Sequence, residues 1–102
     1  MLTLTRCTIT TDDDMFGETM PDAVVVISGD SPNSTAQISV PDNKRRKFVR
    51  VERVLDAVVK GSGKDWVIQG RSEHLEQVVG VSQEESQVTY RINAAGGCQG
   101  CS

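Results

Sequence analysis

The pattern of apolar and polar residues predicts a hairpin in the first half of the chain. Ala23 to Ile27 is a β-branched run, and Ala36 to Val40 follows it with Ile38 and Val40 on one face. The residues between the two runs, Gly29 to Asn33, are typical of a turn. We therefore expect two adjacent antiparallel strands here.

A helix is predicted over residues 44 to 60. Asp42 or Asn43 can cap its start, and Lys60 followed by Gly61 can end it. The apolar residues at helical spacing are Phe48, Val51, Leu55 and Val58, with Val54 beside them. Because valine lowers helix propensity, we expect this helix to depend on docking its apolar stripe against the sheet.

Two more strands are predicted in the second half of the chain. In Asp65 to Gly70, Trp66 and Ile68 share the buried face. The last strand, Gln87 to Asn93, alternates: Val88, Tyr90 and Ile92 point inward, whereas Gln87, Thr89, Arg91 and Asn93 point outward. The segment between these strands, from Leu75 to Val81, is expected to be an irregular and partly buried connection.

The order of elements indicates one domain with a segment on either side. Residues 1 to 21 are interpreted as an extension, in which Leu2 to Thr11 permits an extra strand and Asp12 to Pro21 is typical of a linker. Residues 22 to 93 form the expected domain, a helix on a small mixed sheet. Residues 94 to 102 contain no large apolar side chain and are expected to be a flexible tail.

The composition narrows the class of protein. The 102 residues, 37% apolar and 25% charged, fit a single small domain. The net charge of -3 gives no general attraction to nucleic acid or an anionic membrane, although Lys44 to Lys47 is locally basic. The chain contains neither a signal-peptide pattern nor a long apolar run, so we expect a cytoplasmic protein without nucleic-acid or membrane partners.

The three cysteines, Cys7, Cys98 and Cys101, do not indicate a disulfide framework. The spacing of Cys98 and Cys101 matches half of a zinc site or a redox dithiol, but His74 and Cys7 are the only further candidate ligands. The pair is therefore a weak metal candidate. The run Asp12 to Asp14 lacks the alternating ligands of a calcium loop and is interpreted as a solvated acidic segment.

The ending of the chain resembles that of ubiquitin-like modifiers with the β-grasp fold. Trp66 to Gly70, the polar turn Ser82 to Ser86, the alternating last strand and the pair Gly96-Gly97 match that family in order and spacing. The resemblance covers about three quarters of the chain and is strongest to bacterial ubiquitin-like proteins. It implies an α+β β-grasp fold in which one helix packs on a small mixed sheet.

The resemblance also implies a function. Gly97 would become the mature terminus after a processing protease removes the residues from Cys98 onward. An activating enzyme would adenylate the Gly97 carboxylate, and a conjugating enzyme would help to join it to target proteins through an isopeptide bond. The protein would then be a substrate rather than an enzyme, with no catalytic residue and no cofactor of its own. The expected conjugation and cleavage residues are Gly96, Gly97 and Cys98, and the expected partner surface contains Val67, Thr89, Arg91, Asn93, Ala94 and Ala95.

Other interpretations of the tail remain open from the sequence. Gly96 and Gly97 can belong to a flexible tail without chemistry. A β-grasp sulfur carrier shares the diglycine, although in such proteins it normally ends the chain. A third alternative is an interaction module that is never conjugated, with a metal or redox role for Cys98 and Cys101.

Overall fold

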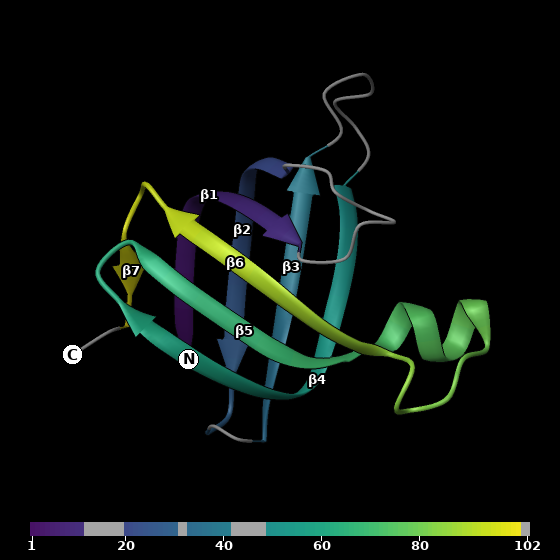
Figure 1. The fold of residues 1–102 in the computed structure, drawn as a ribbon. Coiled ribbons are helices and arrows are strands. Elements are labelled where there is room, and N and C mark those ends of the chain that lie inside the picture. Colours follow the sequence, from purple (N-terminus) through teal and green to yellow (C-terminus); the bar gives the residue numbers. More distant parts are fainter. Residues whose placement is uncertain (12–19, 31–32, 42–48, 101–102) are drawn as a thin grey trace.

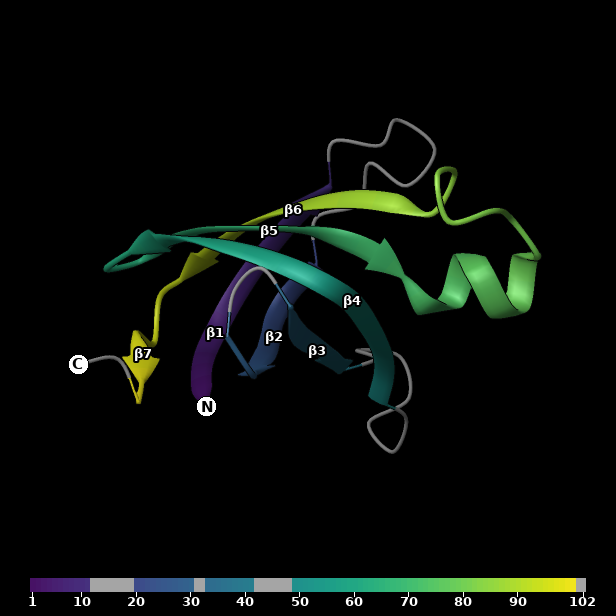
Figure 2. The same ribbon diagram turned by 90° about the horizontal axis from the view of Figure 1, so that it is seen from below.

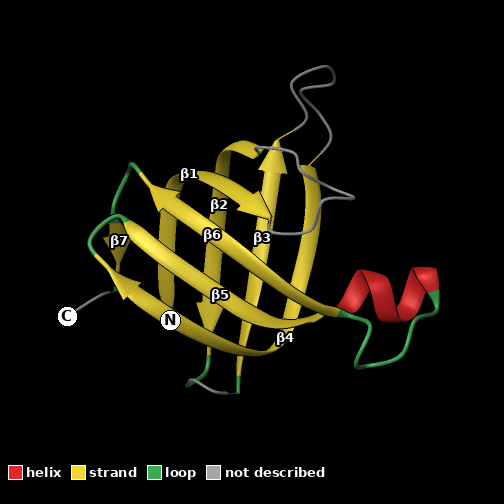
Figure 3. Cartoon of the chain, in the orientation of Figure 1, coloured by secondary structure: helices red, strands yellow, loops and turns green. Residues whose placement is uncertain are grey.

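A computed structural model describes residues 1–11, 20–30, 33–41 and 49–100 of the chain (Figure 1). Its strands are β1 (Leu2–Thr11), β2 (Met20–Ser28), β3 (Ser34–Pro41), β4 (Val49–Ser62), β5 (Asp65–Ser72), β6 (Gln87–Ala94) and β7 (Cys98–Gln99). In this part of the chain the helical element is η1, a five-residue π-helix at Leu75–Val79. Strands therefore dominate the fold (Figure 3).

The first six strands form a closed antiparallel barrel. From β1 to β5 each strand pairs with the next one along the chain. The ring closes because β1 also pairs with β6. The short strand β7 adds to β1 at Thr3 and Leu4. Closure leaves most strand edges paired, which protects a small β protein from edge-to-edge association.

The barrel is flattened into two layers that share β1 and β4 (Figure 2). The back layer contains β2, β3 and the first halves of β1 and β4, whereas the front layer contains β5, β6 and the second halves of β1 and β4. In such barrels a strand that passes from one layer to the other bends at a bulge.

The bends in β1 and β4 coincide with residues of positive φ. Arg6 has φ 50°, and the pairing with β2 shifts register between Leu4 and Cys7. Asp56 has φ 48°, and the pairing with β5 shifts between Leu55 and Val58. These bulges interrupt the two-residue alternation of strands.

The bulge in β4 also explains a glycine in β5. Leu55 pairs with Arg71 and Val58 pairs with Gln69, so Gly70 alone lies opposite two residues of β4. A Cβ atom on Gly70 would lie 2.6 Å from the Leu55 carbonyl oxygen and 2.6 Å from Val54 Cγ1. The bulge thus fills the space that a side chain at position 70 would need.

Both layers contribute side chains to one core. The buried apolar residues from the back layer include Leu4, Val25, Ile27, Ile38 and Val54, and those from the front layer include Cys7, Ile9, Ile68, Tyr90 and Ile92. Several are small, such as Ala23, Ala36, Ala57 and Ala94. Small side chains allow the two layers to approach closely at the bends.

The predicted helix over residues 44 to 60 is wrong for its described part, because residues 49–60 belong to β4. Val54 and Ala57 are both buried, three residues apart, because the bulge at Asp56 turns both toward the core. This spacing imitates one turn of a helix. The strand also agrees with the β propensity of its valines. Asp42, Asn43 and Phe48 lie outside the described residues.

The β-grasp prediction is wrong as well. A β-grasp domain needs a helix packed across its sheet, whereas η1 contains no buried residue and the closed barrel packs one layer of strands on the other. The ubiquitin-like resemblance therefore does not hold, and the α+β class is replaced by an all-β barrel. Conjugation through Gly97 was expected only from that resemblance and stays a prediction.

Other sequence predictions are confirmed. The predicted hairpin is present as β2 and β3, and the predicted strands at 65 to 70 and 87 to 93 are present as β5 and β6. Tyr90 and Ile92 are buried while Arg91 and Asn93 are exposed, as the alternation indicated. Residues 2 to 11, interpreted as part of an extension, form β1 between β2 and β6 and supply three core residues, Leu4, Cys7 and Ile9.

Candidate functional site

The C-terminal segment that was predicted to be free is bound to β1. The Gly96 amide donates to the Thr5 carbonyl oxygen at 3.0 Å, and the Thr5 amide donates to the Gly97 carbonyl oxygen at 3.3 Å. Cys98 is half-buried and pairs with Leu4 in the short β7 ladder. We call residues 95–99 the strap, because they lie along the edge of β1 that β2 leaves open.

Gly96 is needed for this contact. A Cβ atom there would lie 2.2 Å from Thr5 Oγ1 and 2.9 Å from the Thr5 carbonyl oxygen. Gly97 instead has φ 81° and open space around its missing side chain. Both glycines thus have a local structural role: the first permits a close approach and the second permits a turn.

The predicted partner surface divides into two groups. Val67, Arg91 and Asn93 lie on the outer face of the front layer, where Val67 pairs with Arg91, and Thr89 pairs with Gln69 on the same face. Ala94 is instead fully buried in the core, and Ala95 donates its amide to the Arg6 carbonyl oxygen in the strap.

Val67, Arg91 and Asn93, but not Thr89, border a cavity of about 500 Å³ on the outer face of the front layer. We call it the front-layer cavity. Its polar side chains come from four strands and are Thr8, Thr10, Lys60, Asp65, Arg91 and Asn93, and its lining also includes Val67 and Trp66.

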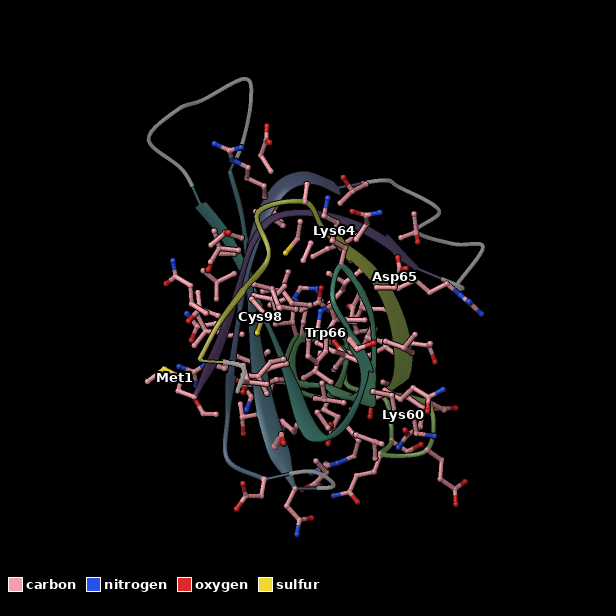
Figure 4. All side chains as sticks on the ribbon, turned by 90° about the vertical axis from the view of Figure 1, so that its left-hand side faces the viewer. Met1, Lys60, Lys64, Asp65, Trp66 and Cys98 are labelled. Atoms are coloured by element: carbon pink, nitrogen blue, oxygen red, sulfur yellow. The ribbon has the colours of Figure 1, made fainter. Side chains whose placement is uncertain are left out.

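Figure 4 looks onto the end of the barrel that bears this cavity. Lys60 and Asp65 lie toward the outer side, whereas Trp66 lies toward the inside of the barrel. The Trp66 indole donates to the Gly63 carbonyl oxygen at 3.0 Å, which ties the ring to the β4–β5 turn. The ring therefore has a fixed position on the inner side of the front layer, and the polar side chains lie on the outer side.

A second concave site lies beside the first half of β4. Residues 49–54 of β4 pair with β3 on one side, whereas pairing with β5 on the other side begins only at Val54. Within the described residues, no strand pairs with the opposite edge of 49–53. A groove of about 240 Å³ lies between this edge and η1, lined by Val51, Glu52, Arg53, Glu73, His74, Gln77 and Val78. We call it the β4-edge groove.

The β4-edge groove combines apolar walls with carboxylates. Val51 is 52% exposed and Val78 is 72% exposed, which are high values for valines in a small domain. Glu52 accepts a hydrogen bond from the Ser72 hydroxyl at 3.1 Å, and Glu73 lies 4.0 Å from the Arg53 guanidinium. The Ser72 hydroxyl also accepts from the Leu75 amide, so it fixes both Glu52 and the start of η1.

A charged cluster connects η1 to the bend of β4. Arg71 binds Asp56 at 2.7 Å and Glu76 at 2.6 Å. The hydrogen bond to Asp56, assisted by Glu76, raises the pKa of the Arg71 guanidinium, which stays charged. Glu76 Oε2 is buried and has no hydrogen-bond partner among the described residues. This cluster holds η1 against the barrel and thereby shapes the β4-edge groove.

The described cysteines differ in state. Cys7 is a buried free thiol, and its burial raises the pKa of that thiol. Cys98 is disulfide-bonded, so its sulfur is not a thiolate ligand in this structure. No cluster of three metal-ligating side chains is found within residues 1–11, 20–30, 33–41 and 49–100.

Some predicted features lie outside the described residues, namely Cys101, the acidic run 12 to 14 and the basic run 44 to 47. Among the described helical residues, none forms a helix long and apolar enough to cross a membrane.

No known protein family, curated protein or solved structure matches this chain. Function is therefore inferred from the geometry alone. The β4-edge groove could not be predicted from the sequence, because the spacing of the valines placed Val51 on a helix, and Lys60 and Asp65 were not predicted to belong to a site. The alternation of β5 and β6 was sufficient to place Val67, Arg91 and Asn93 on one face.

Proposed function

We propose that the chain is a protein-interaction module that binds an extended segment of a partner as an added strand along β4. The edge of 49–53 with which no described strand pairs carries this proposal, because backbone amides and carbonyls at such an edge can pair with another strand. The exposed valines beside the edge provide apolar contact for the same segment.

The two faces of the edge indicate the composition of the partner segment. Val51 pairs with Ser39, which pairs with Val24, so these residues form a row on the outer face of the back layer. Val51 and Val24 are both exposed, and an added strand would extend the row with an apolar residue. Glu52 is on the other face, toward the groove, where the added strand would place its neighbouring residue.

The groove favours a basic residue at that neighbouring position. Glu52 and Glu73 line it together with Arg53, and Arg53 already lies near Glu73. A lysine or arginine of the partner would reach Glu52, whereas a glutamate would meet like charge. The expected partner segment therefore alternates β-branched and basic residues.

We also propose a class of protein and a cellular location for this chain. We propose a binding protein rather than an enzyme, with partner proteins rather than nucleic acid or membranes as targets, in the cytoplasm. The net charge of -3 supports the exclusion of nucleic acid. Conjugation through Gly97 is not part of the proposal, since the strap engages that residue.

Two synthetic peptides test the proposal. One alternates valine and lysine over seven residues, and the other alternates valine and glutamate, so they share the valines and carry opposite charge at the other positions. Titration into ¹⁵N-labelled protein should shift the amide signals of 49–53 with the lysine peptide, and the glutamate peptide should bind about tenfold more weakly. If neither peptide shifts these signals, strand addition at β4 is refuted.

A pair of valine variants locates the contact. Val51→Lys should weaken the lysine peptide at least severalfold, while Val24→Lys, on a strand that is paired on both sides, should leave binding unchanged. Both positions are exposed, so neither variant should lower the free energy of unfolding by more than about 0.5 kcal/mol. Equal effects of the two variants on binding would contradict the assignment of the site to the β4 edge.

A further inference from the structure

The front-layer cavity lies on a different layer from the β4 edge and contains unused hydrogen-bonding groups. Thr8, Lys60, Asp65 and Asn93 line it, and all four side chains are exposed. In the described part of the chain, none of these four side chains makes a hydrogen bond or an ion pair. Their polar groups are therefore available to a ligand.

Strand pairing fixes how these side chains are arranged. One row across the front layer runs Lys60, Val67, Arg91 and Thr10, and a second row runs Asp65, Asn93 and Thr8. Neighbouring strands are about 4.8 Å apart, and residues two apart along a strand are about 7 Å apart. The first row is thus roughly 14 Å long and the second roughly 10 Å, the two rows are about 7 Å apart, and Val67 lies between Lys60 and Arg91.

The mixture of charges excludes strongly charged ligands. Asp65 would repel a polyanion, and Lys60 with Arg91 would repel a polycation. An ammonium group only donates hydrogen bonds and a carboxylate only accepts them, whereas an amide and a hydroxyl do both. The hydroxyl groups of a ligand can satisfy each of the four: one hydroxyl donates to Asp65, another accepts from Lys60, and others do either with Asn93 and Thr8.

The floor of the cavity adds an apolar requirement. Val67 lies on this outer face between Lys60 and Arg91, and its half-buried side chain supplies an apolar surface. A sugar ring combines hydroxyl groups at its edge with an apolar face of C–H groups, which packs well on aliphatic and aromatic side chains. A cavity of about 500 Å³ is within the range of small-ligand sites.

We infer that the front-layer cavity is a binding site for a neutral carbohydrate of one or two sugar rings. Hydroxyl groups of the ligand would bind Asp65, Asn93, Lys60 and Thr8, and its apolar face would pack on Val67. This site is separate from the β4 edge, so a partner strand and a carbohydrate could be bound at the same time.

A glycan array followed by NMR titration tests the inference. Neutral mono- and disaccharides should bind, and the strongest of them should shift the amide signals of Thr8, Lys60, Asp65 and Asn93. Inorganic phosphate is the charged comparison and should cause no such shifts. Failure of every neutral sugar to bind would overturn the inference, and so would preferential binding of phosphate, since it would identify an anion site between Lys60 and Arg91.

Variants with a matched control separate the site from general effects. Asp65→Ala and Asn93→Ala should each raise the Kd of the strongest sugar about tenfold. Asp30→Ala removes an equally exposed carboxylate in the β2–β3 connection, outside the cavity, and should leave the Kd unchanged. Equal binding by all three variants would overturn the inference even if a sugar binds. The peptide titration at β4 is independent of these results.

Discussion

The most informative perturbation is alanine substitution of the two adjacent glycines in the strap. The structure constrains the two positions differently. At position 96 there is no space for a side chain, whereas at position 97 there is space but the backbone conformation is unfavourable for any residue except glycine. Rotation of the Thr5 side chain can relieve the 2.2 Å approach of a new Cβ to Thr5 Oγ1, but the 2.9 Å approach to the Thr5 carbonyl oxygen remains. Gly96→Ala should therefore separate the strap from β1.

The magnitude follows from the bonds that would be lost. Three backbone hydrogen bonds join the strap to Thr5 and Arg6, at 3.0, 3.3 and 3.3 Å. Each contributes about 0.5 to 1.5 kcal/mol net. The released residues regain conformational entropy, which offsets part of the loss. We expect Gly96→Ala to lower the free energy of unfolding by about 1 to 2 kcal/mol.

Gly97→Ala is the matched comparison. Its new Cβ meets nothing within 4 Å, but φ 81° is costly for alanine, by about 1 kcal/mol. Urea unfolding followed by the fluorescence of Trp66, the single tryptophan, measures both changes. Amide hydrogen exchange at Thr5 and Gly96 should accelerate more strongly in Gly96→Ala than in Gly97→Ala.

A free tail gives a different result. If neither variant changes the free energy of unfolding by more than about 0.3 kcal/mol, and if the Gly96 amide of the wild-type protein exchanges as in an unfolded peptide, the docked strap is refuted. The sequence-based interpretation of a flexible tail would then stand.

Three further predictions concern the bulge, the charged cluster and the buried thiol. Gly70→Ala should lower the free energy of unfolding, measured by urea denaturation, by at least about 2 kcal/mol, because the new Cβ would overlap the Leu55 carbonyl oxygen. A decrease of less than about 0.5 kcal/mol would contradict the bulge in β4. Arg71→Met should lower the midpoint of urea unfolding, because it leaves the half-buried Glu76 carboxylate without its cation, and adding Glu76→Gln should recover part of the loss, since the side chain is then uncharged; no recovery would argue against the ion pair as the cause. Burial raises the pKa of the Cys7 thiol in the folded state, so the contribution of Cys7 to the free energy of unfolding is complete below the unfolded pKa of about 8.5 and is lost as the pH rises toward the folded pKa. Between neutral and alkaline pH the free energy of unfolding should therefore fall more steeply for the wild type than for Cys7→Ala. Equal slopes for the two proteins would contradict burial of the thiol.

The sequence by itself determined where the alternating strands lie. In β2, β3, β5 and β6 every second residue faces the core, so apolar periodicity identified these strands and the outward position of Val67, Arg91 and Asn93. The period of two is a local property of an extended chain, and it is visible without knowledge of the partner strands.

Tertiary structure decided the rest. In β1 and β4 the bends at Arg6 and Asp56 interrupt the alternation, and Val54 and Ala57 then show the spacing of a helix. Whether the strap is free or bound depends on the Thr5 edge, which lies some ninety residues earlier in the sequence. Both candidate sites likewise depend on which strands become neighbours, because an unpaired edge and a cavity across four strands exist only once the barrel has closed.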